Sequence, residues 1–408
     1  LCIDATMNID LVRAYYPNAV LRDEIRAETP YQRIVQYPDR AFGKGWLQNQ
    51  GNVADIWAWS KSYAIQRGGR WLLVVQKHVE DKIRAGFKIP DFIDIAHHNN
   101  IAGRDEWKDV TGLIVVGRTQ PPPGAIEKIA GAMTGRARAA IEGWYPAATE
   151  LIRAKDGSAV TVEADRHPDN AAEAVRAAIC DAEVMQIIGR ARGTNRTAAN
   201  PVEVVVLGSL PLDVEVDTVR QWSKPTVDDR MMAEGVWLES AADAARVYPD
   251  LGSREAIKKA KQRKGTIPYK NTLYGNVPNL RTVRFQRKGA GNKACHAVFD
   301  IRIVPEPETW LAEHLGAVTI LGAEIWLPDE DQIEVYDGGI MPPVLRDKVR
   351  NAYQAGNLTQ QAAAERIGLS RPQLANALQG RFGLSHEAAE GLKAFLMQPP
   401  QIIQPRLI

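Results

Sequence analysis

The sequence is poor in cysteine and contains no long hydrophobic run. Its three cysteines, Cys2, Cys180 and Cys295, lie far apart and form no Cys-x-x-Cys pair. This spacing predicts neither a disulfide framework nor a zinc site, and it favours a reducing, cytoplasmic setting. Apolar runs such as residues 71–75 and 113–116 are far shorter than the ~20 residues of a membrane-spanning helix. We therefore expect no membrane partner, and the first residues do not resemble a signal peptide.

Three nucleotide-binding motifs are also missing from the chain. It contains no Gly-x-x-x-x-Gly-Lys-Ser/Thr loop, no Asp-Glu-x-His-type box and no Gly-x-Gly-x-x-Gly turn. The first two cradle phosphates and hold magnesium, so the chain is not expected to catalyse phosphoryl transfer by itself. The absence of the third disfavours a dinucleotide or nucleotide-sugar enzyme.

Charge is distributed unevenly along the 408 residues, although the net charge is only +2. Residues 254–302 contain thirteen lysines and arginines but only two acids, Glu255 and Asp300, so this segment carries +11 and the remainder −9. A strongly basic segment in a nearly neutral chain indicates a polyanionic partner, and we expect DNA. The length and the ordinary share of hydrophobic residues, 45%, allow two or three domains.

Strand-like and helix-like segments alternate over the first half of the chain. Short apolar segments predict buried strands at Arg33–Tyr37, Trp71–Gln76, Phe92–Ala96, Leu113–Val116 and Val202–Leu207. Segments between them predict helices at Asn52–Arg67, Lys77–Ala85, Ala125–Met133 and from Asn170 onwards, and a hairpin around Lys155–Ser158. This alternation is typical of an α/β fold with a parallel sheet covered on both faces, RecA-like or otherwise doubly wound.

The stretch Gln186–Arg196 places three arginines between a predicted helix and a predicted strand. Arginine is always charged and its planar donors match pairs of phosphate oxygens. The alternative is a solvated basic turn. The stretch resembles the sixth motif of superfamily-two helicases, Gln-x-x-Gly-Arg-x-x-Arg, through Gln186, Gly189 and Arg190. The motif's last arginine would fall on Gly193, so Arg190, Arg192 and Arg196 all stay candidates for the arginine that reaches the γ-phosphate of ATP.

Two further stretches resemble helicase motifs, in the order in which the family carries them. Asp4-Ala5-Thr6 is similar to the third motif, which couples the state of ATP to the grip on nucleic acid. Gly103-Arg104-Asp105, beyond the Phe92–Ala96 strand, is similar to the fifth motif, which contacts nucleotide ribose and the nucleic-acid backbone. Ligands of open α/β sheets bind beyond the carboxyl ends of strands.

Met231–Tyr248 is helix-like and acidic, and the basic segment after it predicts a helix at Arg254–Lys264 and two strands, Leu280–Gln286 and Ala294–Ile303. A basic helix followed by a basic hairpin resembles a winged-helix module, whose wing lies along DNA. The alternative is a solvated helix and hairpin. The expected DNA-binding residues are Lys258, Lys259, Lys261, Arg263, Lys264, Arg284, Arg287 and Lys288.

Residues 360–374 follow the helix-turn-helix pattern. Ala364 is small where two helices cross, Gly368 allows the turn, Ser370 caps the second helix and Leu374 packs back into the core. The stretch resembles repressor-type helix-turn-helix proteins, with a further helix at Gly383–Leu396. Arg371, Gln373 and Asn376 are then expected to face the major groove, where arginine suits guanine and the amides suit adenine. The alternative is a helical hairpin used for protein contacts.

Histidines offer a weaker hint of metal binding. Adjacent side chains on a strand point to opposite faces, so His97 and His98 cannot share a ligand set there, and no carboxylate cluster accompanies them. We expect no metal site in this chain. His167 precedes a proline and is expected to be a turn residue.

The resemblance implies four parts. Residues 1–27 would be the tail of a first RecA-like domain, 28–210 a second RecA-like domain with an inserted hairpin, 211–340 a winged-helix-like α+β region and 341–408 an all-α helix-turn-helix domain. The apolar start at Leu1 is expected to be the end of a strand, so that the chain is a fragment. The whole protein would be an ATP-dependent DNA helicase of plasmid or phage replication, with ATP and magnesium held mainly by the missing domain and with other replication proteins as possible partners. The alternative is a non-enzymatic DNA-binding regulator or replication initiator with a degenerate α/β domain.

Overall fold

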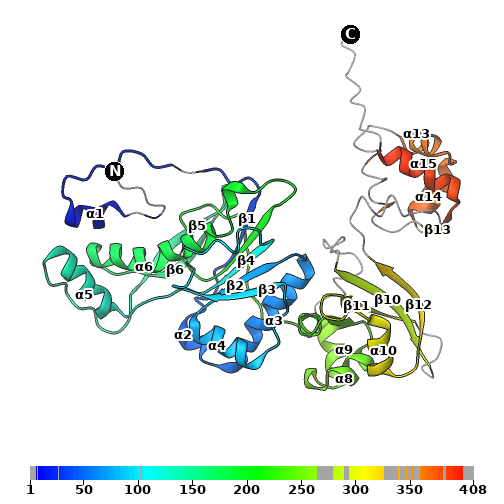
Figure 1. Cartoon of the computed structure of the whole chain (residues 1–408), viewed down its shortest axis with the longest axis horizontal. Helices are drawn as coiled ribbons and strands as arrows, with labels where there is room; N and C mark the ends of the chain where they lie inside the picture. Colours follow the sequence, from blue (N-terminus) through cyan, green and yellow to red (C-terminus); the bar gives the residue numbers. More distant parts are fainter. Residues whose placement is uncertain are drawn as a thin grey trace, which may run out of the picture. The chain divides into compact units, whose positions relative to one another are not determined.

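A computed structural model of the chain describes residues 6, 8–25, 27–101, 103–263, 279–288, 294–325, 339–340, 345–346, 349, 352, 359–379 and 383–397. These residues belong to two compact units (Figure 1). The first comprises residues 1–264 and 302–305, and the second comprises residues 265–301 and 306–408.

A six-stranded sheet of order β3-β2-β4-β7-β1-β8 forms the centre of the first unit. All of its strand pairs are parallel, which confirms the predicted α/β class. The strands are β1 (Gln32–Tyr37), β2 (Trp71–Val75), β3 (Ile93–His97), β4 (Gly112–Val116), β7 (Val202–Leu207) and β8 (Thr218–Val219). The first five coincide with the predicted strands to within a residue or two, because each is a short apolar segment rich in branched side chains.

One face of the sheet is covered by α6 (Asn170–Gly189) and by the hairpin of β5 (Ala147–Arg153) and β6 (Ala159–Asp165). Side chains alternate between the faces of a strand, so Leu72, Leu113 and Val204 lie on this face. They pack in one cluster with Ile187 of α6 and Val162 of the hairpin. The helix α5 (Pro123–Thr134) and the capped helix α1 (Ile9–Tyr15) pack beside α6. Asn8 caps α1, because its side chain accepts from the backbone N–H groups of Asp10 and Leu11.

The opposite face carries α2 (Lys44–Leu47), α3 (Gln50–Arg67) and α4 (Lys77–Gly86) (Figure 1). On α3, Tyr63 and Arg67 both bind the carboxylate of Glu203 on β7, each at 2.8 Å. Gly68 and Gly69 follow the end of α3, and both have φ near +70°, a conformation that suits glycine. Helices on both faces bury the parallel sheet, so that the amino and carboxyl ends of its strands stay accessible to ligands.

The first unit continues through η1 (Gly193–Asn195), α7 (Val227–Ala233), β9 (Val236–Leu238), α8 (Ala241–Val247), η2 (Pro249–Leu251) and α9 (Arg254–Arg263). The prediction of one helix-like stretch over Met231–Tyr248 is wrong. Gly235 has φ +87°, which ends α7, and an added Cβ there would lie 2.7 Å from Ile303. Two short helices with a strand between them take its place.

The second unit contains an antiparallel set of strands, in which β10 (Leu280–Arg287) pairs with β11 (Cys295–Asp300) and with β12 (Val318–Ile325). The helix α10 (Pro307–Leu315) lies between β11 and β12 in the chain and contacts both β10 and β12. Phe285 and Phe299 are fully buried in this part. Two antiparallel strands follow the basic helix in the chain, as predicted.

Three short helices, α13 (Gln360–Ile367), α14 (Arg371–Leu378) and α15 (His386–Met397), share one apolar core in the second unit, beside a two-stranded pairing of β13 (Gly339–Ile340) and β14 (Gly383–Leu384). Gly368 ends α13 in the left-handed conformation, and Ser370 forms a capping box with Gln373 at the start of α14. An added Cβ on Gly391 would lie 2.3 Å from the Ile367 carbonyl, so α15 packs closely on α13. The turn and cap chemistry predicted for this segment is confirmed.

Candidate functional site

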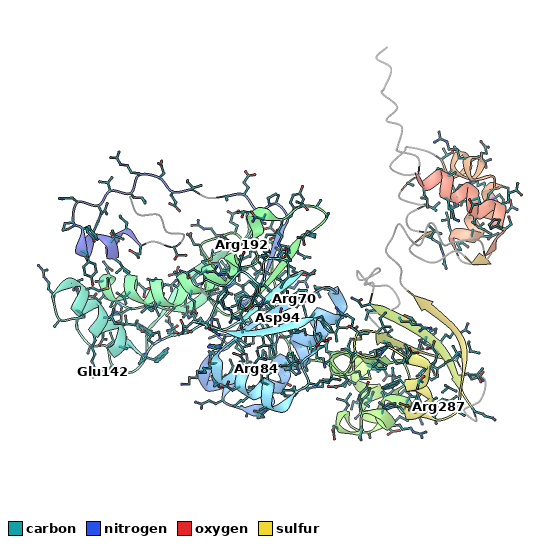
Figure 2. The ribbon with its side chains drawn as sticks, in the orientation of Figure 1. Arg70, Arg84, Asp94, Glu142, Arg192 and Arg287 are labelled. Carbon is teal, nitrogen blue, oxygen red and sulfur yellow. The ribbon has the colours of Figure 1, made fainter. Side chains whose placement is uncertain are left out.

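The arginine-rich stretch lies at the end of α6, because that helix continues to Gly189 and includes Gln186. Arg192 follows in a left-handed conformation, with φ +52°. Its guanidinium binds the carboxylate of Asp105 at 2.6 Å (Arg192 is labelled in Figure 2). Because β7 begins at Val202, the stretch lies toward the amino-terminal edge of the sheet. The predicted fifth and sixth motifs thus meet through one ion pair.

The third predicted motif meets the same stretch. Gln186 donates its side-chain N–H to the hydroxyl of Thr6 at 2.9 Å. Asp4 and Ala5 lie outside the described residues. Three segments separated by about 80 or more residues are therefore joined by side-chain contacts of Thr6, Asp105, Gln186 and Arg192.

Arg190 differs from its neighbours. It is half-buried, and its Nε is buried without a hydrogen-bond partner among the described residues. A buried N–H group without a partner is expected to donate a hydrogen bond to an anionic ligand. At Gly193, where the motif has an arginine, an added Cβ would lie 1.7 Å from Oε1 of Gln32. A side chain at this position would therefore require Gln32 to move.

Arg196 has an internal role. Only 5% of it is exposed, and it donates hydrogen bonds to the carbonyls of Ala191 at 2.8 Å and Lys108 at 2.6 Å, and to Asn200 at 3.0 Å. Burial lowers the pKa of Arg196, yet these acceptors and Asp109 favour its charged form. The side chain ties the arginine loop to the loop that carries Asp105.

The remaining residues of the predicted fifth motif are also ordered. Gly103 has φ +77°, a conformation that suits glycine. Arg104 pairs with Glu106 at 2.6 Å and lies over the ring of Trp107, 4.8 Å from its centre. The hydrogen bond from Arg192 lowers the pKa of Asp105, so this exposed carboxylate stays ionised.

A crevice of about 780 Å³ opens at the carboxyl ends of five sheet strands. The residues that follow these strands line it: Gly43 and Lys44 after β1, Gln76, Lys77 and His78 after β2, His98 and Asn99 after β3, Gly117 to Pro121 after β4, and Gly208 to Leu210 after β7, with Trp144 and Asp165 from the hairpin side. Apart from His98, none of these residues belongs to a sequence motif. The signal that could have found them is the polar or glycine residue directly after every predicted strand.

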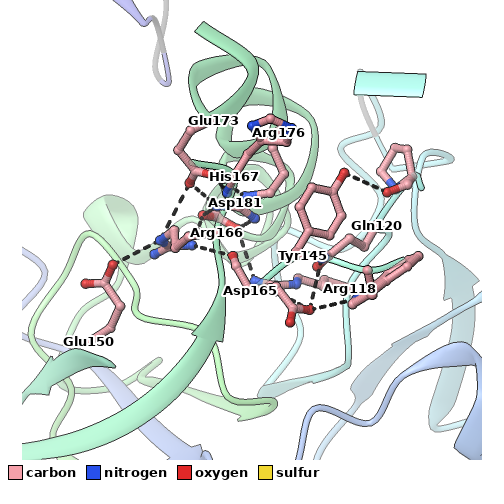
Figure 3. A network of polar contacts seen from close by, with 12 residues as sticks. Arg118, Gln120, Tyr145, Glu150, Asp165, Arg166, His167, Glu173, Arg176 and Asp181 are labelled. Atoms are coloured by element: carbon pink, nitrogen blue, oxygen red, sulfur yellow. Dashed lines mark hydrogen bonds and ion pairs between the residues drawn. The ribbon is translucent and has the colours of Figure 1, made fainter. Parts of the chain in front are cut away.

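A network of charged side chains supports one wall of the crevice (Figure 3). Asp165 accepts from Gln120 at 2.9 Å and from Trp144 at 3.3 Å, and it pairs with Arg118 at 3.5 Å. Burial lowers the pKa of Arg118, which Asp181 and Asp165 counteract. The wall is therefore fixed by pairs of opposite charge rather than by apolar packing.

The two adjacent histidines point to different partners, as expected. His97 binds Glu80 of α4 at 2.6 Å, whereas His98 is 3% exposed and its Nε2 lies 3.2 Å from the carbonyl of Val116. Burial lowers the pKa of His98 to about 4. His167 is buried, accepts the backbone N–H of Asp169 at Nδ1 and lies 3.3 Å from Glu127 through Nε2. It is a turn residue, as predicted.

We expect His98 to make folding depend on pH. The pKa of about 4 lies below the ordinary 6.5, so the folded state binds fewer protons than the unfolded state between these values. The stabilisation that comes from keeping His98 neutral is complete above about pH 6.5 and is lost as the pH falls toward about 4. The free energy of unfolding should fall by about 2 kcal/mol at about pH 5 relative to neutral pH. Urea titration of the wild type and of His98→Gln, in which this component should vanish, measures it; equal pH dependence in both would contradict it.

The predicted basic surface separates into exposed and internal lysines. Lys258 and Lys259 on α9 are exposed, as are Arg284 and Lys288, and Arg287 is half-exposed (labelled in Figure 2). Lys261 instead points inward, donates to the carbonyl of Leu238 at 2.6 Å and pairs with Asp228 at 3.3 Å. Its ammonium also lies 4.6 Å from the centre of the Trp237 ring. The side chain of Arg263, and Lys264, lie outside the described residues.

The predicted base-reading residues lie on α14. Arg371, Gln373 and Asn376 are all exposed. Oε1 of Gln373 accepts from the backbone N–H of Ser370 at 2.9 Å and from its hydroxyl at 2.8 Å. The side chain of Gln373 therefore takes part in capping α14, whereas the side chains of Arg371 and Asn376 do not.

Comparison with known proteins gives no relative, since no protein-family profile, curated protein or solved structure matches the chain. In the part of the chain that the structure describes, no three His, Cys, Asp or Glu residues gather so that they could hold a metal ion. None of the described helices is both long and apolar enough to cross a membrane.

Proposed function

We propose that this chain is the arginine-supplying and DNA-binding portion of an ATP-dependent DNA helicase or translocase of the superfamily-two type. One observation carries the proposal. The stretch that resembles the sixth helicase motif forms side-chain contacts with both of the other stretches, since Gln186 donates a hydrogen bond to Thr6 and Arg192 binds Asp105. Chance resemblances would not be expected to converge in space. The test is whether a protein that joins this chain to a phosphate-loop domain hydrolyses ATP faster when DNA is present.

In this proposal ATP is shared between two domains. Arg190 and Arg192 would approach the γ-phosphate, and Arg190 is the better candidate for the arginine finger because its Nε has no partner among the described residues. Arg192 is already paired with Asp105. The phosphate cradle and the carboxylates for magnesium would come from another domain, since the sequence contains neither motif. When bound, ATP with magnesium would supply the phosphoryl group that is transferred. Arg190 and Arg192 would neutralise charge on that group.

The basic region fits a winged-helix module in the order of its elements. The chain runs through helix α7, strand β9, helices α8 and α9, and then the antiparallel strands β10 and β11. In such a module the second of the paired helices faces DNA, and here that helix is α9 with the exposed Lys258 and Lys259. The predicted wing, residues 289–293, lies outside the described residues.

The helices α13 and α14 fit a helix-turn-helix. A left-handed Gly368 separates them and a capping box starts the second helix. Leu374 is fully buried in the core while Arg371 and Asn376 are exposed on the same helix. We propose that α14 reads base edges in the major groove, with arginine on guanine and asparagine on adenine.

Neutralising the exposed lysines of α9 should weaken binding to every duplex alike. The change Lys258→Ala with Lys259→Ala removes two phosphate contacts and the counterion release that accompanies them. The slope of log affinity against log salt should shrink by about one per lost contact. Fluorescence anisotropy at several salt concentrations measures the slope. Because Lys261 is internal, Lys261→Ala is the control: it should lower the free energy of unfolding and leave the slope unchanged. Equal slopes in wild type and double variant would contradict the proposal.

Changes on α14 should act on one sequence only. Arg371→Ala or Asn376→Ala removes a bidentate base contact, which costs about 1–3 kcal/mol at the preferred site and little on random DNA. The site is first selected from random duplexes, and affinity is then measured for both DNAs. Gln379→Ala, an exposed change at the end of the same helix, is the matched control. Equal weakening on both DNAs, or none, would show that α14 serves as a protein adaptor.

A second candidate function rests on the same helices. A capped helix-turn-helix also suits a DNA-binding regulator or replication initiator that hydrolyses no ATP. This candidate predicts sequence-specific binding by α14 without any effect of Arg190→Ala on the activity of the whole protein.

A further inference from the structure

The crevice lies beyond the carboxyl ends of the strands, at the point where the order of strand addition in the sheet reverses. The strands β2 and β4 are neighbours, yet the connection from β2 leads outward to β3 and the connection from β4 leads the other way to β7. Neighbouring strands whose connections diverge leave an opening beyond their carboxyl ends, which is where ligands of open α/β sheets bind. The opening here is the crevice of about 780 Å³, large enough for a small organic ligand. It lies at the opposite edge from Arg190 and Arg192.

One side of the crevice offers donors for an anion. The ten-residue helix α4 begins there, and no side chain caps its amino end. Such an end presents free N–H groups and partial positive charge. Lys44 and Lys77 also line the crevice and are exposed, and neither has an ion pair within the described structure. A phosphate at this position would meet backbone donors and two ammonium groups together.

Buried polar atoms at the crevice lack partners. His98 is 3% exposed and Nε2 is bound to Val116, whereas Nδ1 lies 4.0 Å from a carboxylate oxygen of Glu183 and has no hydrogen bond in the described structure. Since Nε2 donates its hydrogen to that carbonyl, Nδ1 is an acceptor. Gln76 donates to the carbonyl of Arg118 at 3.3 Å, but its Oε1 is also buried and unpartnered. Unsatisfied buried acceptors are costly, so a ligand that also carries donors would be stabilised here.

An aromatic surface completes the lining. Trp144 borders the crevice and half of its surface is exposed. Its indole N–H lies 3.3 Å from Asp165 and its ring packs edge-on against Tyr145, so the ring is held in place. A ring fixed in this way and open to solvent suits a planar, stacked ligand.

From these features we propose that the crevice binds a nucleoside phosphate, with the phosphate at the amino end of α4 between Lys44 and Lys77, the base on Trp144, and sugar or base donors directed to His98 and Gln76. The unit could be a free nucleotide or one residue of a single strand, because both present the same chemistry. The site is separate from the arginine stretch, so it does not depend on the proposed role of Arg190.

Isothermal titration of the whole chain with thymidine monophosphate tests this site. Trp144→Ala, and Lys44→Ala with Lys77→Ala, should each weaken binding about tenfold, the effect expected for one lost stacking or phosphate contact. All three side chains are exposed, so the fold should survive. Trp144→Phe keeps a stacking surface and should stay within about threefold of wild type. The charge-matched control, Lys88→Ala with Lys128→Ala, removes two exposed lysines away from the crevice and should have no effect.

Competition then identifies the source of the ligand. If an oligothymidylate displaces thymidine monophosphate, the crevice holds a residue of a strand; if it does not, the crevice holds a free nucleotide. Where only the oligothymidylate binds, the same variants are measured with it. The proposal is overturned if neither ligand binds saturably, if inorganic phosphate competes as well as the nucleotide, or if the control variant weakens binding as much as the crevice variants. None of these results bears on the duplex binding of α9 or on ATP turnover.

Discussion

If the proposed function holds, replacing Arg190 with alanine is expected to lower ATP turnover by about 10³–10⁵-fold in a protein that joins this chain to a phosphate-loop domain. An arginine finger neutralises charge that develops on the transferred phosphate, and no other group can take its place at once. Arg190 is half-buried and its Nε has no partner among the described residues, so its loss should cost the fold little. Steady-state turnover and urea unfolding of the same preparations measure the two effects.

The neighbouring arginines provide matched controls for this result. Arg196→Ala should lower the free energy of unfolding by about 2–3 kcal/mol, because it leaves buried carbonyls unpaired. Arg192→Ala breaks the pair with Asp105 and should have an intermediate effect on turnover. If Arg190→Ala and Arg192→Ala both leave turnover within a few-fold of wild type, the helicase interpretation of this stretch fails.

A large loss of stability is expected from Arg176→Met on α6. Arg176 is fully buried and donates two hydrogen bonds at 2.7 Å to Glu173 and two, at 2.7 and 3.1 Å, to Asp181. Burial lowers the pKa of Arg176, but these carboxylates more than offset this, and the net pKa is raised. Removing the guanidinium leaves two partly buried carboxylates without this partner, which costs about 3–5 kcal/mol of stability.

The matched control is Arg166→Met, which breaks pairs with Glu150 and Asp181 in the same network (Figure 3). The Arg166 side chain is 21% exposed, so water screens its loss, and we expect about 1 kcal/mol. Urea unfolding at neutral pH measures both variants. If the two changes cost the same, Arg176 is not the centre of the network.

The parallel sheet was predictable because its strands are short apolar segments bounded by glycine and polar residues. The Lys155–Ser158 turn was equally clear, and β5 and β6 pair around it. The stretch over Met231–Tyr248 was misjudged because Gly235, a lone glycine in a helix-like pattern, ends one helix and admits a strand. Helices and strands are therefore predicted best where the spacing of apolar residues and the positions of turn residues indicate the same element.

The candidate site was only partly predictable. Motif resemblance selected Gln186, Arg190 and Asp105, but which arginine is free depends on contacts with Lys108 and Asp105 that lie some 80 residues away. The inward direction of Lys261, next to the outward Lys258 and Lys259, likewise depends on packing against Trp237. The crevice at the carboxyl edge results from strand order, which no single segment encodes.

The most direct test of the proposed function is ATP turnover with and without DNA, measured on a longer protein that contains this chain and a phosphate-loop domain. The account predicts turnover that DNA stimulates, and that falls when Lys258→Ala with Lys259→Ala weakens the DNA contact at limiting DNA. The chain alone should bind DNA and release no phosphate from ATP above the level of its Arg190→Ala variant. Joined protein that binds DNA tightly but shows no DNA-dependent turnover would contradict the account and leave the DNA-binding regulator in its place.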